Sequence, residues 1–403
     1  MDFSDSPAEA DFRAKARAWL AENAPAFEYH AGPDDSEADM LTAAKRWQFA
    51  KYEAGWACLT WPKEYGGQGL SSVEASIFAS EESGWSVTSS PFGIGQGMAA
   101  PTMMAYANDE QKARFLPKLA SGEEIWCQLF SEPAGGSDLA ALRTRAIRDG
   151  DDWVINGQKI WTSGAHYSDF AILVTRSDPD VPKHQGLTYF FLDMKSPGIE
   201  VKPIKQISGE SHFNEVYFTD VRIPDAQRLG APGEGWKVSI TTLMNERASI
   251  GGGGGLGFES AFELAYDTEL ATGPAIDDRA VRAQLATWYC REAGLEYTNA
   301  RTQSALSRGE TPGPENSIGK LVGAKQSQDI ASFCIDLLDM AGVANSDANA
   351  FLDAYMSIPG LRIAGGTDEI MLNIIAERVL GLPQDIRPDK GVPFTDVPTG
   401  ANN

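Results

Sequence analysis

The sequence predicts a mostly α-helical protein with a β domain in the middle of the chain. Apolar residues recur at helical spacing over residues 7–122, and the pattern changes near Ile125 to short runs of β-forming residues. Helical spacing returns after Gly235. These changes of period predict an all-α N-terminal domain, a middle β domain, a C-terminal helical domain and a surface tail, at residues 1–124, 125–234, 235–385 and 386–403.

The N-terminal region carries apolar stripes typical of packed helices. One stripe contains Phe12, Ala16 and Leu20, and a second contains Trp47 and Ala54. The glycine-rich residues 61–69 predict a loop between helices.

The middle region contains five short β-type runs separated by Gly, Pro, Asp and Asn. They are residues 125–130, 153–155, 170–174, 187–192 and 214–218. Their number and spacing predict a small antiparallel domain, either a barrel or a sandwich. The dipeptide Asn156-Gly157 predicts a hairpin turn within it.

The C-terminal region predicts several long helices that form a bundle. Helical spacing covers residues 285–288, 321–340 and 374–379, with interruptions at 273–274 and 311–314. The proline-rich and acidic residues from Leu382 onward predict a tail on the surface.

Composition excludes several classes of function. The 403 residues are 42% hydrophobic and 22% charged, as in soluble globular proteins, and the net charge of −22 argues against nucleic-acid and anionic membrane surfaces. No apolar run is long enough to span a bilayer, and the first residues lack the features of a signal peptide, so we expect a cytoplasmic protein. The four cysteines and four histidines are scattered, which predicts neither a disulfide framework nor a metal site.

The most unusual stretch is residues 243–255, which end in five glycines. Apolar spacing on both sides favours one helix through the glycines, at a cost of about 5 kcal/mol relative to alanines. Such a helix would allow the close approach of a ligand. The alternative is a flexible loop between two helices.

Two further stretches carry candidate binding residues, each with a structural alternative. Residues 131–138 follow a predicted strand, and their small side chains expose backbone amides that either bind an anion or form a tight turn. In residues 156–165, Trp161 beside Thr162 and Ser163 offers either an aromatic plane with polar edges or a core tryptophan.

A third stretch, residues 365–370, precedes an apolar helix. Thr367 or Asp368 predicts an ordinary N-cap, and the amides at such a helix start would also suit a pyrophosphate or a carbonyl oxygen. The chain lacks the Gly-Lys-Ser/Thr of a phosphate-binding loop and a dinucleotide-binding βαβ motif in a suitable setting.

Taken in this order, these stretches resemble the acyl-CoA dehydrogenase family of flavoproteins. The specific motifs are Ser-Glu-Pro-Ala-Gly-Gly-Ser-Asp at 131–138 and residues 213–224, and the resemblance extends from 61–67 to 375–381. It implies an N-terminal helical domain, a central small β-barrel and a C-terminal domain of the four-helix-bundle type. It also implies FAD bound in an extended form without a Rossmann unit.

The resemblance also assigns roles to individual residues. The implied cofactor contacts are Gln128, Leu129, Phe130, Ser131, Gly136, Ser137, Trp161, Thr162, Ser163, Thr367 and Glu369. The implied substrate contacts are Ser137, Asn245, Arg247 and Gly365.

The implied reaction removes the α proton of an acyl-CoA and transfers the β hydride to flavin N5, which requires one carboxylate base. Many members carry this base where the chain has Gly365, and a glycine side chain accepts no proton. The isovaleryl-CoA and long-chain branches carry it in a Glu-Arg pair, which matches Glu246-Arg247. The resemblance therefore places the base at Glu246. The alternative is an exposed helical glutamate paired with an arginine.

The resemblance implies an acyl-CoA substrate, an electron-transfer flavoprotein as acceptor, and a homodimer, homotetramer or heterotetramer. The intersubunit arginine motif and the Gly-Gly motif that many members use to contact FAD are absent from residues 269–274 and 339–343. Similar losses occur in relatives that act on steroid side chains or other bulky acyl groups, so the resemblance implies a role in fatty-acid or steroid side-chain catabolism. Two alternatives are a flavin monooxygenase or oxidase on the same fold, and a non-catalytic subunit that completes a partner's FAD site.

Overall fold

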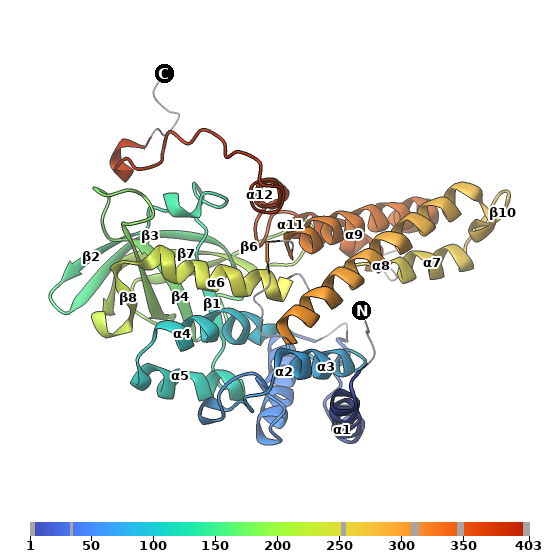
Figure 1. Cartoon of the computed structure of the whole chain (residues 1–403), viewed down its shortest axis with the longest axis horizontal. Helices are drawn as coiled ribbons and strands as arrows, with labels where there is room; N and C mark the ends of the chain where they lie inside the picture. Colours follow the sequence, from blue (N-terminus) through green and yellow to red (C-terminus); the bar gives the residue numbers. More distant parts are fainter. Residues whose placement is uncertain are drawn as a thin grey trace. The chain divides into compact units, whose positions relative to one another are not determined.

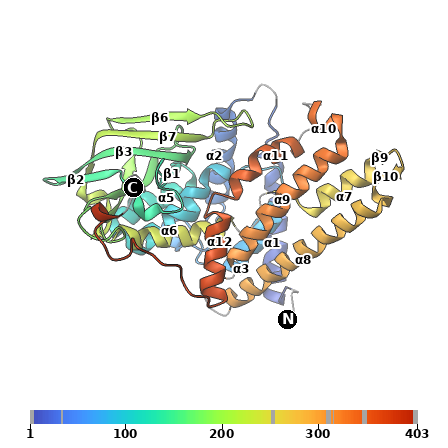
Figure 2. The same cartoon turned by 90° about the horizontal axis from the view of Figure 1, so that it is seen from above.

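The computed structural model describes residues 5–32, 35–250, 255–307, 313–314, 316–344 and 350–397. The chain forms two compact units, which Figures 1 and 2 colour by sequence position. Unit 1 comprises Met1–Lys205, Ser211–Glu246 and Ile386–Asn403. Unit 2 comprises Gln206–Glu210 and Arg247–Asp385.

The N-terminal part of unit 1 is helical, as predicted. Its helices are α1 (Pro7–Asn23), α2 (Glu37–Glu53), α3 (Ser72–Glu82), α4 (Ala100–Tyr106) and α5 (Asp109–Ser121). Capping boxes begin α1 at Ser6, α3 at Ser71 and α5 at Asn108, where the side chain satisfies a free backbone N–H. The apolar stripes meet in an aromatic core in which Trp19 packs against Trp47.

The β domain is one curved sheet in which each of the five predicted runs lies in a strand. The strands are β1 (Trp126–Leu129), β2 (Arg145–Asp149), β3 (Asp152–Ser163), β4 (Phe170–Arg176), β5 (Leu187–Asp193), β6 (Ile199–Ile204), β7 (Phe213–Pro224) and β8 (Arg228–Gly233). Their order is β6-β7-β3-β2-β4-β5-β8, and β1 pairs in parallel with β4. Strands β2, β6 and β8 escaped prediction because their sequences are short or rich in charged, proline and glycine residues.

Two cores lie on the two faces of this sheet. Leu173 and Phe190 belong to the core that the curved sheet encloses. Ile172 and Phe191 belong to the core between the sheet and helices α4, α5 and α6 (Gly235–Ile250), which lie together on this face in Figure 1. Strands β4 and β5 are buried on both faces, which explains their continuous apolar sequences.

The predicted hairpin turn at Asn156-Gly157 is wrong, because both residues lie inside β3. The pairing of β3 with β7 shifts register between Ile155 and Gly157, so the dipeptide marks a β-bulge. A Cβ at Gly157 would lie 2.6 Å from Thr144 Oγ1. The glycine therefore permits a close approach between neighbouring strands.

Unit 2 is helical, as predicted for the C-terminal region. It contains α7 (Phe258–Asp267), α8 (Arg279–Ser307), α9 (Asn316–Leu338), α10 (Met340–Ala344), α11 (Ala350–Leu361) and α12 (Asp368–Ile374), with a short hairpin of β9 (Glu269–Leu270) and β10 (Gly273–Pro274). Trp288 of α8 and Ile330 of α9 pack with Ala261 of α7 in its core. Among the described residues, no helix combines the length and the apolar character needed to cross a bilayer.

The expectation of one helix through the glycine run is wrong. Helix α6 ends at Ile250 and α7 begins at Phe258. Residues 251–254 lie outside the described residues, and Gly255 to Gly257 are not helical. The core of unit 2 therefore begins with a separate helix, α7.

Candidate functional site

Helix α6 is fixed on the sheet by a buried hydroxyl cluster. Thr242 Oγ1 lies 2.8 Å from Thr102 Oγ1 of α4 and 3.0 Å from the Tyr189 hydroxyl of β5. Thr242 and Tyr189 are fully buried, and burial raises the pKa of Tyr189, so its hydroxyl stays protonated. Residues four apart share one helix face, so the face that carries Thr242 also carries Glu246.

Gln128 of β1 contacts Glu246 on this face. Successive side chains of a strand alternate between faces, and Trp126 lies in the core beneath the helices while Cys127 lies in the enclosed core. Gln128 therefore points toward α6, where its Nε2 donates a hydrogen bond of 3.1 Å to Glu246 Oε2. Both side chains are partly buried. The structure thus brings together two predicted site residues that are far apart in the sequence.

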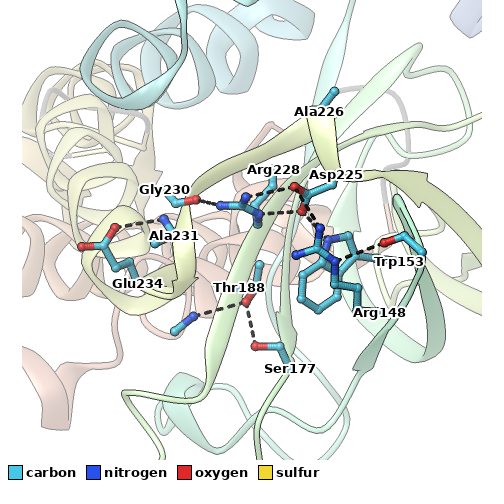
Figure 3. Close-up of polar contacts among 12 residues, drawn as sticks. Arg148, Trp153, Ser177, Thr188, Asp225, Ala226, Arg228, Gly230, Ala231 and Glu234 are labelled. Carbon is cyan, nitrogen blue, oxygen red and sulfur yellow. Dashed lines mark hydrogen bonds and ion pairs between the residues drawn. The ribbon is translucent and has the colours of Figure 1, made fainter.

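The start of α6 is anchored by a second polar network, drawn in Figure 3. Asp225, in the short helix Asp225–Gln227, accepts hydrogen bonds of 2.7 Å from Trp153 Nε1 of β3 and 2.8 Å from Arg228 Nε of β8. Arg228 also donates to the Gly230 carbonyl, and Glu234 accepts from the Ala231 amide at 2.9 Å. This network leads directly into the helix that carries Glu246.

We expect Asp225→Asn to destabilise the protein at neutral pH. The Arg228 and Trp153 hydrogen bonds lower the pKa of Asp225 to about 2. Its stabilisation is therefore present at neutral pH and is lost as the pH falls toward 2. Loss of the charged hydrogen bonds costs about 1.5–3 kcal/mol, or a few degrees in Tm at about 2–4 °C per kcal/mol.

Calorimetry at several pH values checks this expectation. The difference in Tm between wild type and Asp225→Asn should shrink only below pH 4, near the usual carboxyl pKa. The neighbouring Asp151 is exposed, so Asp151→Asn is the matched control and should leave Tm unchanged. Equal effects of the two variants would contradict the assigned role of Asp225.

The loop at residues 131–138 is held at its beginning by a buried ion pair. Lys159 of β3 is 0% exposed, and its Nζ donates to Glu132 Oε1 at 2.8 Å and to the Phe130 carbonyl at 2.9 Å. Glu132 also accepts from the backbone amides of Arg143 at 2.6 Å and Thr144 at 2.8 Å. Burial opposes ionisation of Glu132, but Lys159 and these donors outweigh burial and keep the pKa of Glu132 below its usual value.

A second buried lysine holds the end of the same loop. Lys183 Nζ donates to Asp138 Oδ1 at 2.8 Å and Oδ2 at 2.7 Å. Between these two anchors Gly136 and Ser137 are exposed, and a Cβ added at Gly136 would meet nothing within 4 Å. The loop, held at both ends, thus leaves Gly136 and Ser137 accessible.

Trp161 lies in a strained bulge of β3. Its φ is +60°, a conformation that is rare for a residue with a side chain, and the pairing of β3 with β7 shifts register between Lys159 and Thr162. The indole is 57% exposed and packs edge-on against Phe213. The alternative of a core tryptophan is therefore wrong, because the bulge leaves more than half of the indole side chain exposed.

Next to it, Thr162 is buried and its Oγ1 has no hydrogen-bond partner among the described residues. Such an unpaired hydroxyl costs about 1–3 kcal/mol, unless a ligand or water satisfies it. The Thr162 carbonyl accepts a hydrogen bond of 3.0 Å from Asn214 Nδ2 of β7. The same Nδ2 lies 3.1 Å from His166 Nδ1. Asn214 and His166 were not predicted as site residues, since Asn214 only resembled an ordinary strand position.

The other predicted residues between Leu129 and Arg247 differ in burial. Leu129 and Phe130 are core side chains, so a ligand could reach them only through the backbone. Ser131 and Ser163 are partly buried, and Asn245 Nδ2 donates to the Thr241 carbonyl at 2.8 Å. The side chain of Arg247 lies outside the described residues.

Three predicted residues of unit 2, Gly365, Thr367 and Glu369, lie at the start of α12. Gly365 has φ +65° and Gly366 has φ +99°, left-handed conformations that favour glycine. Thr367 caps α12 by accepting from the Ile370 amide at 3.3 Å, which confirms the predicted N-cap, and Glu369 is exposed. A glutamate base at position 365 would therefore also strain the backbone, by about 1–3 kcal/mol.

The carboxylate of Asp368, which follows this cap, is held by Arg362. Arg362 Nε donates to Asp368 Oδ2 at 2.7 Å, and Lys320 Nζ donates to the Gly366 carbonyl. These contacts fix the loop, and sequence reasoning found only its cap.

Comparison with known proteins identifies the family of this chain. Models for the N-terminal, middle and C-terminal domains of acyl-CoA dehydrogenases match residues 6–123, 127–221 and 233–380. The acyl-CoA dehydrogenase IpdE1 of Mycobacterium tuberculosis is 36% identical over 387 residues, which cover 94% of this chain and 98% of that protein. The acyl-CoA dehydrogenase FadE34 of the same organism is 39% identical, over 87% of this chain and 48% of that protein. The chain thus spans about half the length of FadE34.

Solved structures agree. The ChsE4-ChsE5 complex from Mycobacterium tuberculosis matches with a TM-score of 0.77 and 31% identity, over 96% of this chain and 100% of that chain. The steroid acyl-CoA dehydrogenase Tcur3481-Tcur3483 matches with a TM-score of 0.77 and 28% identity, over 96% and 100%. With the three domain matches in chain order, this chain belongs to the acyl-CoA dehydrogenase family of FAD-dependent oxidoreductases that act on acyl-CoA thioesters.

Proposed function

We propose that this protein catalyses the α,β-dehydrogenation of an acyl-CoA to the trans-2-enoyl-CoA, with Glu246 as the base that removes the α proton. The observation that carries the proposal is the contact between Glu246 and Gln128 on the sheet face beneath α6. An ionised carboxylate accepts hydrogen bonds through its oxygens and can act as a general base.

Residues of unit 1 fit the cofactor of the family. A flavin ring needs a flat surface, polar donors at its edge and room for its phosphates. Trp161 supplies an exposed plane, and the open space at Gly136 leaves room for backbone contacts. The Thr162 hydroxyl, which has no hydrogen-bond partner within the described part of the chain, supplies a donor. Thr367 and Glu369 remain predicted cofactor residues.

Each side chain has a defined task in this proposal. Bound FAD supplies the acceptor for the β hydride. Glu246 takes the α proton onto its carboxylate, and Gln128 keeps that carboxylate oriented by the 3.1 Å hydrogen bond. The hydroxyl cluster at Thr242 fixes the rotation of α6, and hence the direction of Glu246.

The family relatives guide the choice of substrate. The Tcur3481-Tcur3483 protein is a steroid acyl-CoA dehydrogenase, so we include a bulky, steroid-like acyl group among the candidate substrates. An electron-transfer flavoprotein as acceptor and a cytoplasmic location complete the proposal. An oligomer is expected, because the solved ChsE4-ChsE5 relative is a complex.

The decisive experiment is anaerobic mixing of the purified flavoprotein with a panel of straight, branched and steroid-side-chain acyl-CoAs. We expect at least one to bleach the flavin absorbance and yield an enoyl-CoA. No bleaching by any thioester, together with oxygen consumption on an added substrate, would instead favour a flavin monooxygenase or oxidase.

A second candidate function is that of one subunit in a heteromeric enzyme. The ChsE4-ChsE5 complex and the two-part name of the Tcur3481-Tcur3483 protein favour it. Expression of the chain alone tests this candidate. This candidate would be supported if the chain lacks FAD when it is expressed alone and retains FAD when it is coexpressed with a related chain.

A further inference from the structure

The C-terminal segment at residues 386–397 packs on the β domain within unit 1. The amide of Phe394 donates to the Val181 carbonyl at 2.9 Å, and the amide of Thr395 donates to the Pro179 carbonyl at 3.2 Å. These bonds attach the segment to the turn between β4 and β5. A tail predicted only to lie on the surface therefore has a defined docking position.

One connection runs from this segment to the ligand loop through Lys183. Asp389 Oδ2 lies 2.6 Å from Lys183 Nζ, and the same ammonium group holds both oxygens of Asp138. The Lys183 side chain is only 4% exposed, whereas the Asp138 side chain is 54% exposed and the Asp389 side chain 21%, so a buried ammonium group links two carboxylates at the surface. Asp138 immediately follows Ser137 of the predicted binding loop.

A second connection runs through Arg176. The Phe394 ring covers the Arg176 guanidinium, with 3.8 Å between the guanidinium carbon and the ring centroid. This guanidinium donates to the carbonyls of Ala140 at 2.6 Å and Leu142 at 3.2 Å. It thereby binds the chain just beyond the loop and keeps two buried carbonyls paired.

We propose that residues 386–397 form a positioning element that holds Gly136 and Ser137 in their binding geometry. The segment contacts the buried cations Lys183 and Arg176. Each cation donates hydrogen bonds to the C-terminal side of the loop or to the residues just beyond it. Exposed loop residues lose about 1–2 kcal/mol of backbone entropy each on ordering, and the two connections remove part of that cost before a ligand binds. That the ligand is FAD or acyl-CoA rests on the proposed function.

Hydrogen–deuterium exchange of the FAD-loaded, full-length protein tests the proposal without requiring turnover. Asp389→Asn and Phe394→Ala each break one connection and should speed amide exchange in residues 134–142. The expected increase is about tenfold, as for the loss of one charged hydrogen bond or cation–π contact. Asp389→Glu should restore slow exchange. Asp396 lies in the same segment and is exposed, so Asp396→Asn is the matched control and should match wild type.

Steady-state kinetics supply a second readout. The loop binds the ligand but takes no part in the chemical step. Asp389→Asn and Phe394→Ala should therefore raise the KM for acyl-CoA several-fold and leave kcat nearly unchanged. Unchanged exchange at 134–142 in both variants would overturn the proposal, as would a uniform increase throughout unit 1. If no acyl-CoA bleaches the wild-type flavin, the proposed function fails, but the exchange experiment still decides the positioning role.

Discussion

Replacing Glu246 by Gln is expected to lower the rate of flavin reduction by acyl-CoA by about 10²–10⁴-fold, the usual contribution of a general base. Gln preserves the size of the side chain and can still pair with Gln128, but it cannot accept the α proton. Rapid mixing under anaerobic conditions measures this rate directly. FAD content and substrate affinity should stay close to wild type, because the defect lies in proton removal.

Two controls separate this expectation from general damage to the protein. Glu246→Asp keeps a carboxylate on a shorter side chain and should recover part of the rate. Glu22→Gln makes the same chemical change at an exposed position of α1 and should leave the rate unaffected. Bleaching at the wild-type rate in Glu246→Gln would remove Glu246 from the mechanism and leave it as an ordinary helical glutamate.

The fold was largely predictable because the spacing of apolar residues along the sequence matches the pattern of buried side chains in most helices and strands. The apolar runs in β4 and β5 are long and buried on both faces, so composition alone indicated strands. Asn156-Gly157 misled because a bulge and a hairpin turn both favour glycine, and only the contact with Thr144 distinguishes them. The glycine run misled because apolar spacing on both sides does not require a continuous helix.

The candidate site was predictable in its residues but not in its connections. The family motif indicated Gln128 and Glu246 separately, yet their contact depends on which face β1 turns toward α6. The buried lysines could not be identified, because Lys159 and Lys183 have no distinctive sequence setting. Contacts between distant segments depend on the folded arrangement, and local pattern carries little information about them.

Lys159→Met is expected to have the largest effect on stability, about 3–5 kcal/mol in the free energy of unfolding at neutral pH. The substitution leaves Glu132 buried with two backbone donors but without its cation. Urea titrations followed by tryptophan fluorescence measure the loss. Lys195→Met is the control, because Lys195 forms its ion pair on the surface and should change stability by less than about 0.5 kcal/mol.

The pH dependence of this loss distinguishes an uncompensated charge from a packing defect. In the wild type the pKa of Glu132 is lowered, so its stabilisation is present at neutral pH and is lost as the pH falls through that lowered value. Without Lys159, burial dominates and raises the pKa of Glu132, so acidification protonates the carboxyl and stabilises the variant. The difference in stability between wild type and Lys159→Met should therefore narrow as the pH falls below neutrality. Lys159→Met combined with Glu132→Gln should be more stable than Lys159→Met alone at neutral pH, and a gap that is constant with pH would indicate that packing, rather than the buried carboxylate, determines the loss.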